Sequence, residues 1–409
     1  MTKKNLLVGQ SGGPTAAINA TLAGVLSQAQ ISEQIDTVYG AFNGIEGVMK
    51  ETFVNLTEKI PNTDAINLLC QTPSAALGSC RYKLEDYKVC EEEYQKILDV
   101  FRKYNIGYFV YIGGNDSMDT VMKLSQYLNQ KEISDIFIMG APKTIDNDLM
   151  GTDHCPGFGS AAKYIATTFA ELVCDTNAYM QKSVTVVEVM GRNAGWLTAS
   201  SALARLCGGK GPDLIYLCER PFSCEQFLND VRDKLETQSS VLIAVSEGIH
   251  DKNGIYISEQ TQSGQVDNFG HKYIAGAARS LEEMIRNAIG CKVRSIELNL
   301  MQRAAGHIAS ATDLEESYML GSKAVIAMLE GKTGEMSAIR RLPTKDYKIE
   351  TFSIPIEQIA NHEKKIPLSW INEAGNDITP ELMNYLVPLI QGEVNVRYQN
   401  GIPMHLTLK

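Results

Sequence analysis

The sequence predicts an α/β protein of three-layer architecture, built from two doubly wound domains with mostly parallel sheets. Two observations predict this class. Short apolar runs alternate with longer segments whose apolar residues recur at helical spacing, and glycine, proline or charged residues follow the runs. Such runs are typical of parallel strands that helices cover on both faces. The expected strands are residues 6–8, 109–112, 136–139, 184–190, 214–217 and 241–245.

Composition and charge limit the kinds of molecule that the protein is expected to bind. Of 409 residues, 44% are apolar and 21% are charged, and the formal charge of −10 suits a soluble protein that binds neither bulk nucleic acid nor anionic membranes. No apolar stretch approaches the roughly 18 residues of a membrane span, and the run after Lys3 and Lys4 is too short for a signal peptide. Nine cysteines without a C-x-x-C pair are expected to be free thiols in a reducing cytoplasm.

A glycine-rich turn, residues 9–14, lies between the first expected strand and the helical segment 15–28. Glycine lets backbone N–H groups approach phosphate oxygens and a helix N-terminus favours an anion, so Gly12 and Gly13 are candidates for a phosphate cradle. The same string matches the G-x-S-x-G elbow of serine hydrolases, with Ser11 as the nucleophile. A tight turn without any ligand is the third interpretation.

Two more polar turns follow expected strands. Asn115 and Asp116 follow two glycines and offer oxygen ligands to a hard cation, or alternatively cap the next helix. Residues 142–148 combine Lys143, a hydroxyl and two carboxylates, which suits acid–base chemistry and phosphate binding as well as an ordinary polar loop. Because the carboxyl ends of parallel strands share one edge of a sheet, we expect the three turns to converge on one cleft.

Seven sequence blocks, which run in order through most of the chain, resemble the phosphofructokinase family. A single block could arise by chance, whereas seven in the family's order and approximate spacing are highly specific. The blocks are Ser11-Gly12-Gly13, Gly78-Ser79-Cys80-Arg81, Gly113-Gly114 with Asp116-Ser117, Thr144-Ile145-Asp146-Asn147-Asp148, Met190-Gly191-Arg192, Ser246-Glu247-Gly248, and Val293-Arg294 with Gln302-Arg303.

The resemblance implies two Rossmann-like domains with the active site between them. Gly12, Gly13 and Arg81 would bind the donor phosphate, and Asp146 would act as the general base for the C1 hydroxyl of fructose 6-phosphate. In relatives a neighbouring subunit helps to bind the 6-phosphate, so a homodimer or homotetramer is expected. The positions that match sugar-phosphate contacts are Thr144, Ile145, Met190, Gly191, Arg192, Glu247, Arg294 and Arg303.

Two positions point to pyrophosphate as the donor. In ATP-using relatives the residue matching Asp116 is typically glycine, which leaves room for the α-phosphate of the nucleotide. A carboxylate repels that phosphate by about 4 kcal/mol for unit charges roughly 4 Å apart at an effective dielectric of about 20. Lys143 also replaces a usual glycine, and its ammonium group would bind pyrophosphate and stabilise charge as the bond breaks. Arg192 and Mg²⁺ would supply further positive charge.

Departures from the family pattern leave details open. Asn115 stands where many relatives have a metal-binding aspartate, and its carbonyl group can still coordinate Mg²⁺ directly or through water. Asn193 stands where pyrophosphate-using relatives often have histidine. Such changes are compatible with a preference for another sugar phosphate, such as sedoheptulose 7-phosphate.

The predicted reaction is a reversible, Mg²⁺-dependent transfer between pyrophosphate and fructose 6-phosphate in cytoplasmic sugar metabolism. We expect a donor-binding domain in residues 1–160, rejoined by about 305–355, and a sugar-phosphate-binding domain in 161–304, with 356–409 packing peripherally. Three alternatives stay open. They are an ATP-dependent sugar-phosphate kinase, a serine hydrolase built on Ser11, and a noncatalytic subunit that binds sugar phosphate.

Overall fold

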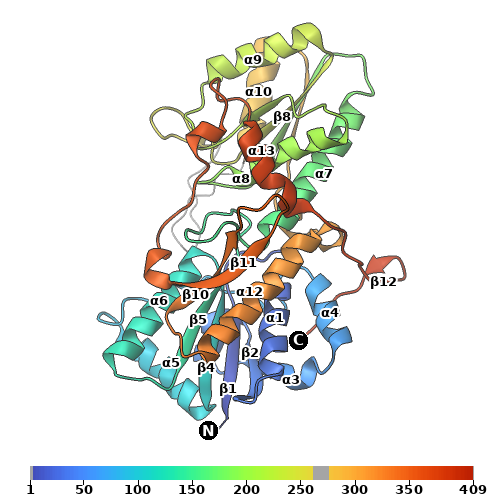
Figure 1. Ribbon diagram of the computed structural model, residues 1–409. Coiled ribbons are helices and arrows are strands. Elements are labelled where there is room, and N and C mark those ends of the chain that lie inside the picture. Colours follow the sequence, from blue (N-terminus) through green and yellow to red (C-terminus); the bar gives the residue numbers. More distant parts are fainter. Residues whose placement is uncertain (1–2, 261–275, 409) are drawn as a thin grey trace.

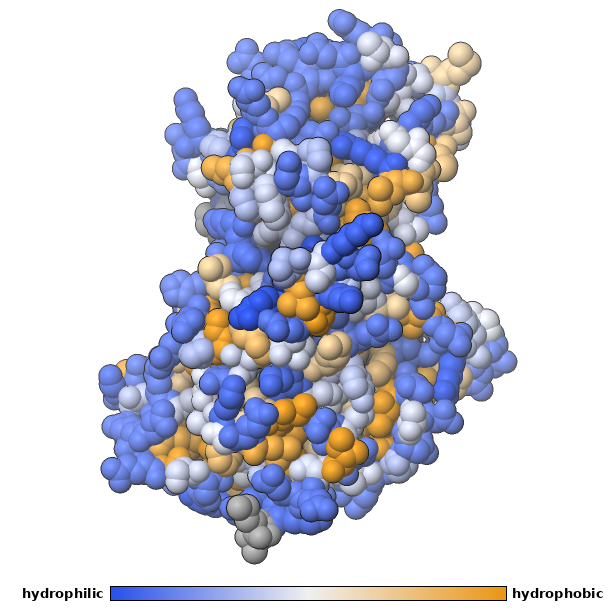
Figure 2. Space-filling view, viewed as in Figure 1, coloured by the Kyte–Doolittle hydropathy of each residue, from blue (hydrophilic) through white to orange (hydrophobic). Residues whose placement is uncertain are grey.

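The structure is a computed structural model that describes residues 3–260 and 276–408. The chain forms two lobes, each built around one sheet, and both termini lie in the larger lobe (Figure 1). Hydrophilic residues cover most of the face shown in Figure 2, including the waist between the lobes. In the described ranges, no helix is long and apolar enough to cross a membrane.

A seven-stranded sheet forms the centre of the larger lobe, in the order β11-β10-β5-β4-β1-β2-β3. Its pairs are parallel except at the two edges, where β3 and β11 run antiparallel to their neighbours. Helices α1 and α12 pack on one face, and α5 and α6 pack on the other. The strands are β1 (Lys4–Gln10), β2 (Ile35–Ala41), β3 (Phe53–Asn55), β4 (Ile106–Gly113), β5 (Phe137–Pro142), β10 (Glu335–Arg341) and β11 (Ile349–Pro355). The longer helices are α1 (Ile18–Gln30), α5 (Glu91–Lys103), α6 (Asn115–Gln130) and α12 (Ala311–Leu329).

A four-stranded parallel sheet forms the smaller lobe, in the order β7-β8-β6-β9. Helices α7, α8 and α13 pack on one side of it, and α9 and α10 pack on the other. The strands are β6 (Ser183–Val189), β7 (Leu214–Tyr216), β8 (Ser240–Ser246) and β9 (Lys292–Glu297). The helices are α7 (Phe158–Thr176), α8 (Trp196–Ser200), α9 (Cys224–Thr237), α10 (Ala277–Ile289) and α13 (Pro380–Leu386).

These two sheets confirm the predicted class of α/β layers with mostly parallel strands. All six expected strands are present, because each is a run of apolar residues buried on both faces. Strand β9 was not predicted, since it lies at a sheet edge and its sequence KVRSIE exposes every second or third side chain. The larger sheet takes strands from residues 4–142 and 335–355, while the exact domain boundaries stay predictions.

The C-terminal part of the chain connects the two lobes. After β11 it packs Ile366, Leu382 and Leu386 into the core beside α7 and α8. It then returns to the larger lobe, where the Leu406 N–H donates to Thr72 Oγ1 at 2.8 Å. The remaining α-helices and strands are α2 (Gly44–Met49), α3 (Leu56–Lys59), α4 (Thr63–Gln71), α11 (Met301–Ala304), β12 (Tyr398–Gln399) and β13 (Ile402–Pro403).

The crossing of α1 and α12 depends on two glycines. A Cβ on Gly24 would lie 2.0 Å from the backbone oxygen of Tyr318, and a Cβ on Gly321 would lie 2.0 Å from that of Thr21. The two helix backbones therefore touch directly, and neither position has room for a side chain.

We predict that Gly24→Ala lowers the free energy of unfolding by roughly 1–3 kcal/mol, because the helices must separate to admit the methyl group. In an isolated helix the same change would be stabilising. Urea unfolding monitored by circular dichroism measures the effect, with Gln28→Ala on the same helix as the control. An unchanged or higher midpoint for Gly24→Ala would contradict the close approach.

Candidate active site

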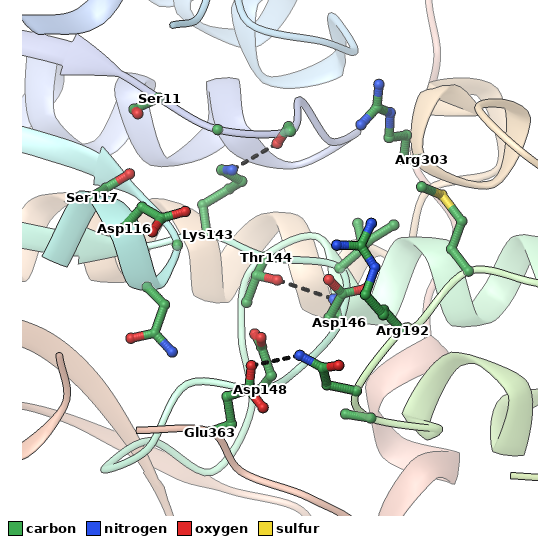
Figure 3. Close-up of a pocket in the computed structure, with 18 of the residues that line it drawn as sticks. Ser11, Asp116, Ser117, Lys143, Thr144, Asp146, Asp148, Arg192, Arg303 and Glu363 are labelled. Carbon is green, nitrogen blue, oxygen red and sulfur yellow. Dashed lines mark hydrogen bonds between the residues drawn. The ribbon is translucent and has the colours of Figure 1, made fainter. Parts of the chain in front are cut away.

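A cleft of about 640 Å³ lies between the lobes, where the carboxyl ends of strands from both sheets face each other (Figure 3). The three polar turns predicted to converge all line it, since they follow β1, β4 and β5 in the same sheet. The loops after β6 and β8 line the opposite wall. The sequence-predicted residues that line the cleft are Gly12, Gly13, Arg81, Asn115, Asp116, Lys143, Thr144, Ile145, Asp146, Met190, Arg192, Glu247 and Arg303.

Lys143 connects two of the turns. Its Nζ donates to the backbone oxygen of Gly13 at 2.6 Å, and its own N–H donates to Gly113 at 2.9 Å. Gly12 adopts a left-handed conformation with φ +76°, and a Cβ there would lie 3.1 Å from the same Nζ. The ammonium group therefore needs the bare backbone of the first turn, which explains why glycine is required there.

The ammonium group of Lys143 is unusual in being almost completely enclosed, since the residue is only 2% exposed. Burial, with a smaller contribution from the nearby positive charge of Arg303, lowers its pKa to about 8. The carboxylates of Asp146 and Asp148 oppose this shift. An anion in the cleft would relieve the repulsion among these cations, so the site is poised to accept negative charge.

Asp146 lies three residues after Lys143 on the same loop that follows β5, and both residues line the cleft (Figure 3). The Thr144 hydroxyl accepts its N–H at 3.1 Å, which fixes the turn that presents the carboxyl group. Burial, with smaller contributions from the carboxylates of Asp148 and Glu247, raises the pKa of Asp146 to about 7. A carboxyl group with a pKa near neutrality suits a general base.

The opposite wall comes from the loops after β6 and β8. The Gly191 N–H donates to Glu247 Oε1 at 3.3 Å, and Ser246 Oγ donates to the Gly191 oxygen at 2.6 Å. Gly191 thus supports the wall without itself lining the cleft. Arg192 points toward Asp146 (Figure 3), and its buried Nε has no hydrogen-bond partner within the described ranges. An unsatisfied buried donor of this kind is ready for a ligand oxygen.

The two C-terminal arginines of the family pattern separate in space. Arg303, on α11, lies beside the first turn, since a Cβ on Gly13 would be 3.0 Å from its Nη1. Arg294 lies outside the cleft on the edge strand β9, where it lines a second pocket with Tyr179 and Lys292. In a single chain Arg294 therefore does not join the other predicted residues.

Asn115 and Asp116 begin α6 at the rim of the cleft. Asp116 is exposed and faces the space beside Lys143 (Figure 3). Asn115 uses both ends of its amide: Oδ1 accepts from the Asn361 N–H at 2.9 Å, and Nδ2 donates to the His362 oxygen at 2.9 Å. Metal ligation by Asn115 stays a prediction, and these hydrogen bonds compete with it.

The cleft includes three residues that sequence reasoning missed, namely Asn361, His362 and Glu363. They come from the polar stretch after β11, which was assigned to peripheral packing. No motif marks them, because their place depends on how the C-terminal part crosses from one lobe to the other.

Comparison with known proteins agrees with this geometry. The family model described as Phosphofructokinase matches residues 5–328. The chain belongs to the phosphofructokinase family. A protein of Xanthomonas campestris named pyrophosphate--fructose 6-phosphate 1-phosphotransferase is 40% identical over 100% of this chain and 97% of its own. One of Methylococcus capsulatus with the same name is 40% identical over 100% and 96%. The crystal structure of a pyrophosphate-dependent phosphofructokinase from Nitrosospira multiformis has a TM-score of 0.89 and 37% identity, covering 100% of this chain and 97% of that one.

Proposed function

We propose that the protein transfers a phosphoryl group reversibly between pyrophosphate and the C1 hydroxyl of fructose 6-phosphate. The observation that carries the donor assignment is the presence of Asp116 and Lys143 at one end of the cleft. Full-length relatives named for pyrophosphate support the same donor. An ATP-dependent kinase is not favoured, because Asp116 would meet the α-phosphate of the nucleotide with a like charge.

Donor binding uses the buried cation and the glycine turn. Lys143 would hold pyrophosphate against Gly12 and Gly13, with Arg81 and Arg303 adding positive charge. Phosphoryl transfer requires mainly in-line placement and neutralisation of charge on the moving group. Because Lys143 is already held by the Gly13 oxygen, little reorganisation is needed when the charge shifts to the leaving phosphate.

Acceptor activation uses Asp146, on the loop after β5, together with the wall formed by the loops after β6 and β8. Asp146 would accept the proton of the C1 hydroxyl as that oxygen forms its bond to phosphorus and the bond to the leaving phosphate breaks. Arg192 and Glu247 would hold the sugar, with Met190 and Gly191 shaping the wall. Arg192 and Glu247 would place the hydroxyl in line with the donor. Such placement is the main contribution that a protein makes to this reaction.

Mg²⁺ is part of the proposal as a companion of pyrophosphate, whose charge it would neutralise. Among the described residues, no three His, Cys, Asp or Glu side chains lie close enough to share an ion. Mg²⁺ usually keeps several waters and binds through substrate phosphates with one or two carboxylates, so such a cage is not required. The amide of Asn115, with both ends hydrogen-bonded, does not fit a dedicated ligand.

We also propose that the protein forms a homodimer or homotetramer. Its two domains would bind different substrates. Arg294 would meet a sugar 6-phosphate in a neighbouring copy, because it lies outside its own cleft, on the edge strand β9. The donor-binding turns all belong to the larger sheet and the sugar wall to the smaller one, which supports domains near 1–160 with 305–355 and 161–304.

All nine cysteines are free thiols, in keeping with the proposed cytoplasmic location.

The hydrolase and regulatory alternatives have less support. Ser11 is buried and its hydroxyl donates to the backbone oxygen of Cys80 at 3.4 Å, so it is not presented as a nucleophile. A noncatalytic sugar-phosphate-binding subunit would not need the perturbed pair Lys143 and Asp146.

We predict that Asp146→Asn lowers kcat by roughly 10²- to 10⁴-fold, because the amide cannot accept the proton. The KM for fructose 6-phosphate should stay nearly unchanged, since the amide has the same size. Steady-state kinetics with pyrophosphate measure both constants, and Asp36→Asn on the surface of β2 is the control. A variant that keeps wild-type turnover would exclude Asp146 as the base.

The donor assignment predicts that Asp116→Gly raises the ratio of kcat/KM for ATP to that for pyrophosphate by at least about tenfold, as removal of a repulsive charge worth over 1.4 kcal/mol implies. Combining it with Lys143→Gly should raise the ratio further, since the nucleotide gains more room. Kinetics with both donors at fixed fructose 6-phosphate provide the test. An unchanged ratio, or a wild-type enzyme that prefers ATP, would refute the assignment.

We predict a bell-shaped pH dependence of kcat/KM. The rate should rise as pH increases through about 7, where Asp146 loses its proton, and fall above about 8, where Lys143 loses its own. Replacing Lys143 with arginine should shift the alkaline limb upward, because a guanidinium group stays protonated. A wild-type profile that is flat from about pH 6 to 9 would contradict these roles.

A further inference from the structure

Residues 361–363 form a short strap across one end of the cleft. All three line the cleft, and Glu363 lies beside Asp148, away from Lys143 (Figure 3). All three residues are exposed to solvent, so apolar packing does not hold them in place. Their position must therefore come from hydrogen bonds.

The strap is bonded to the larger lobe through Asn115. This amide accepts the Asn361 N–H and donates to the His362 oxygen, both at 2.9 Å. Asn361 Nδ2 also donates to Asp119 Oδ1, one turn further along α6, at 3.3 Å. Only a side chain that both donates and accepts can make the pair of bonds formed by Asn115, and aspartate cannot.

The strap is bonded to the smaller lobe through Asn193. Its Nδ2 donates to Glu363 Oε1 at 2.8 Å. Asn193 directly follows the Met190–Arg192 stretch that forms the sugar wall. The two asparagines that depart from the family pattern thus bind adjacent residues of the strap, Asn115 from the larger lobe and Asn193 from the smaller one.

The next residue, Lys364, fastens the strap to the loop that carries Asp146. Its N–H donates to the Asp148 oxygen at 2.7 Å, and its Nζ donates to the Asp153 oxygen at 2.7 Å. Its own oxygen accepts from Trp196 Nε1 at 3.1 Å. One end of the strap is therefore fixed, and the bonds to Asn115 and Asn193 set the position of the remainder.

We propose that Asn115 and Asn193 are positioning residues that anchor residues 361–363 across the cleft, and that the strap holds the donor wall and the sugar wall in register. The kinetic consequence of this inference rests on the proposed function. The anchoring of residues 361–363 by the two asparagines does not depend on it. It assigns Asn115 the work of an anchor in place of a metal ligand. Contact with the strap then explains both departures from the family pattern, Asn115 and Asn193.

The substitution Asn115→Asp distinguishes the anchor role from metal ligation. A carboxylate is the better ligand for Mg²⁺ and also suits the first turn of α6, where it meets the positive end of the helix dipole. In the anchor role it is worse, because one oxygen would face the His362 oxygen where an N–H group now donates. The same substitution therefore has opposite expected effects.

The first measurement is hydrogen–deuterium exchange at the Asn361 amide, resolved by peptide fragmentation. Because Asn361 is exposed, protection of this amide reports its bond to Asn115. Asn115→Ala and Asn193→Ala should each raise its exchange rate by roughly two- to tenfold, the range expected for loss of one hydrogen bond. Asn193 does not contact this amide, so its effect tests the strap as a unit. Unchanged exchange in both variants would overturn the inference, whatever reaction the protein catalyses.

The second measurement is the kinetics of Asn115→Asp and Asn193→Ala. Both should raise the KM for fructose 6-phosphate by roughly two- to tenfold, with a smaller effect on that for pyrophosphate, and Asn193→Gln should recover part of the loss. Asn129→Ala, on the exposed far end of α6, is the matched control and should leave exchange and kinetics unchanged. If Asn115→Asp keeps full activity and needs less Mg²⁺ for half-saturation, Asn115 is a metal ligand and the inference is wrong.

Discussion

The hydrogen bond from Lys143 to the backbone oxygen of Gly13 is the interaction on which the cleft depends. It places a cation, almost without solvent contact, at the junction of the turns that follow β1, β4 and β5. An ammonium group is costly to bury unless carbonyl groups and carboxylates surround it. The bare backbone of the first turn and the acidic loop after β5 meet that need, so the arrangement of both turns follows from one buried charge.

The charges around this ammonium group are divided between the ends of the cleft. Cationic side chains gather near the glycine turn, while the carboxylates of Asp148 and Glu363 lie at the end of the cleft that the strap crosses (Figure 3). A protein with a formal charge of −10 can bind a polyanion only where it concentrates positive charge locally. Burial and the neighbouring carboxylates raise the pKa of Asp146, whereas the positive charges of Lys143 and Arg192 oppose that rise, so charges of both signs adjust the base.

The C-terminal part of the chain gives the cleft its second set of constraints. It leaves the larger sheet after β11, passes along the cleft as the strap, and buries Ile366 and Leu382 in the smaller lobe. The walls of the cleft are thus joined by a covalent connection with hydrogen bonds to both sides, as well as by the direct connections between the sheets. Substrate specificity in such a cleft depends on the distance between its walls, since in-line transfer tolerates little misplacement.

The sequence by itself determined the layered α/β class, the strands that are apolar on both faces, and the convergence of three turns on one cleft. Local patterns determine these features, because a buried parallel strand needs continuous apolar residues and a phosphate turn needs glycine. Only the tertiary structure decided the place of Arg294, the strap at residues 361–363 and the bonds of Asn115 and Asn193. The bonds of Asn115 and Asn193 join residues 170 or more positions apart, to backbone groups in the first case and to a carboxylate in the second, and such pairs leave no periodicity or motif in the sequence.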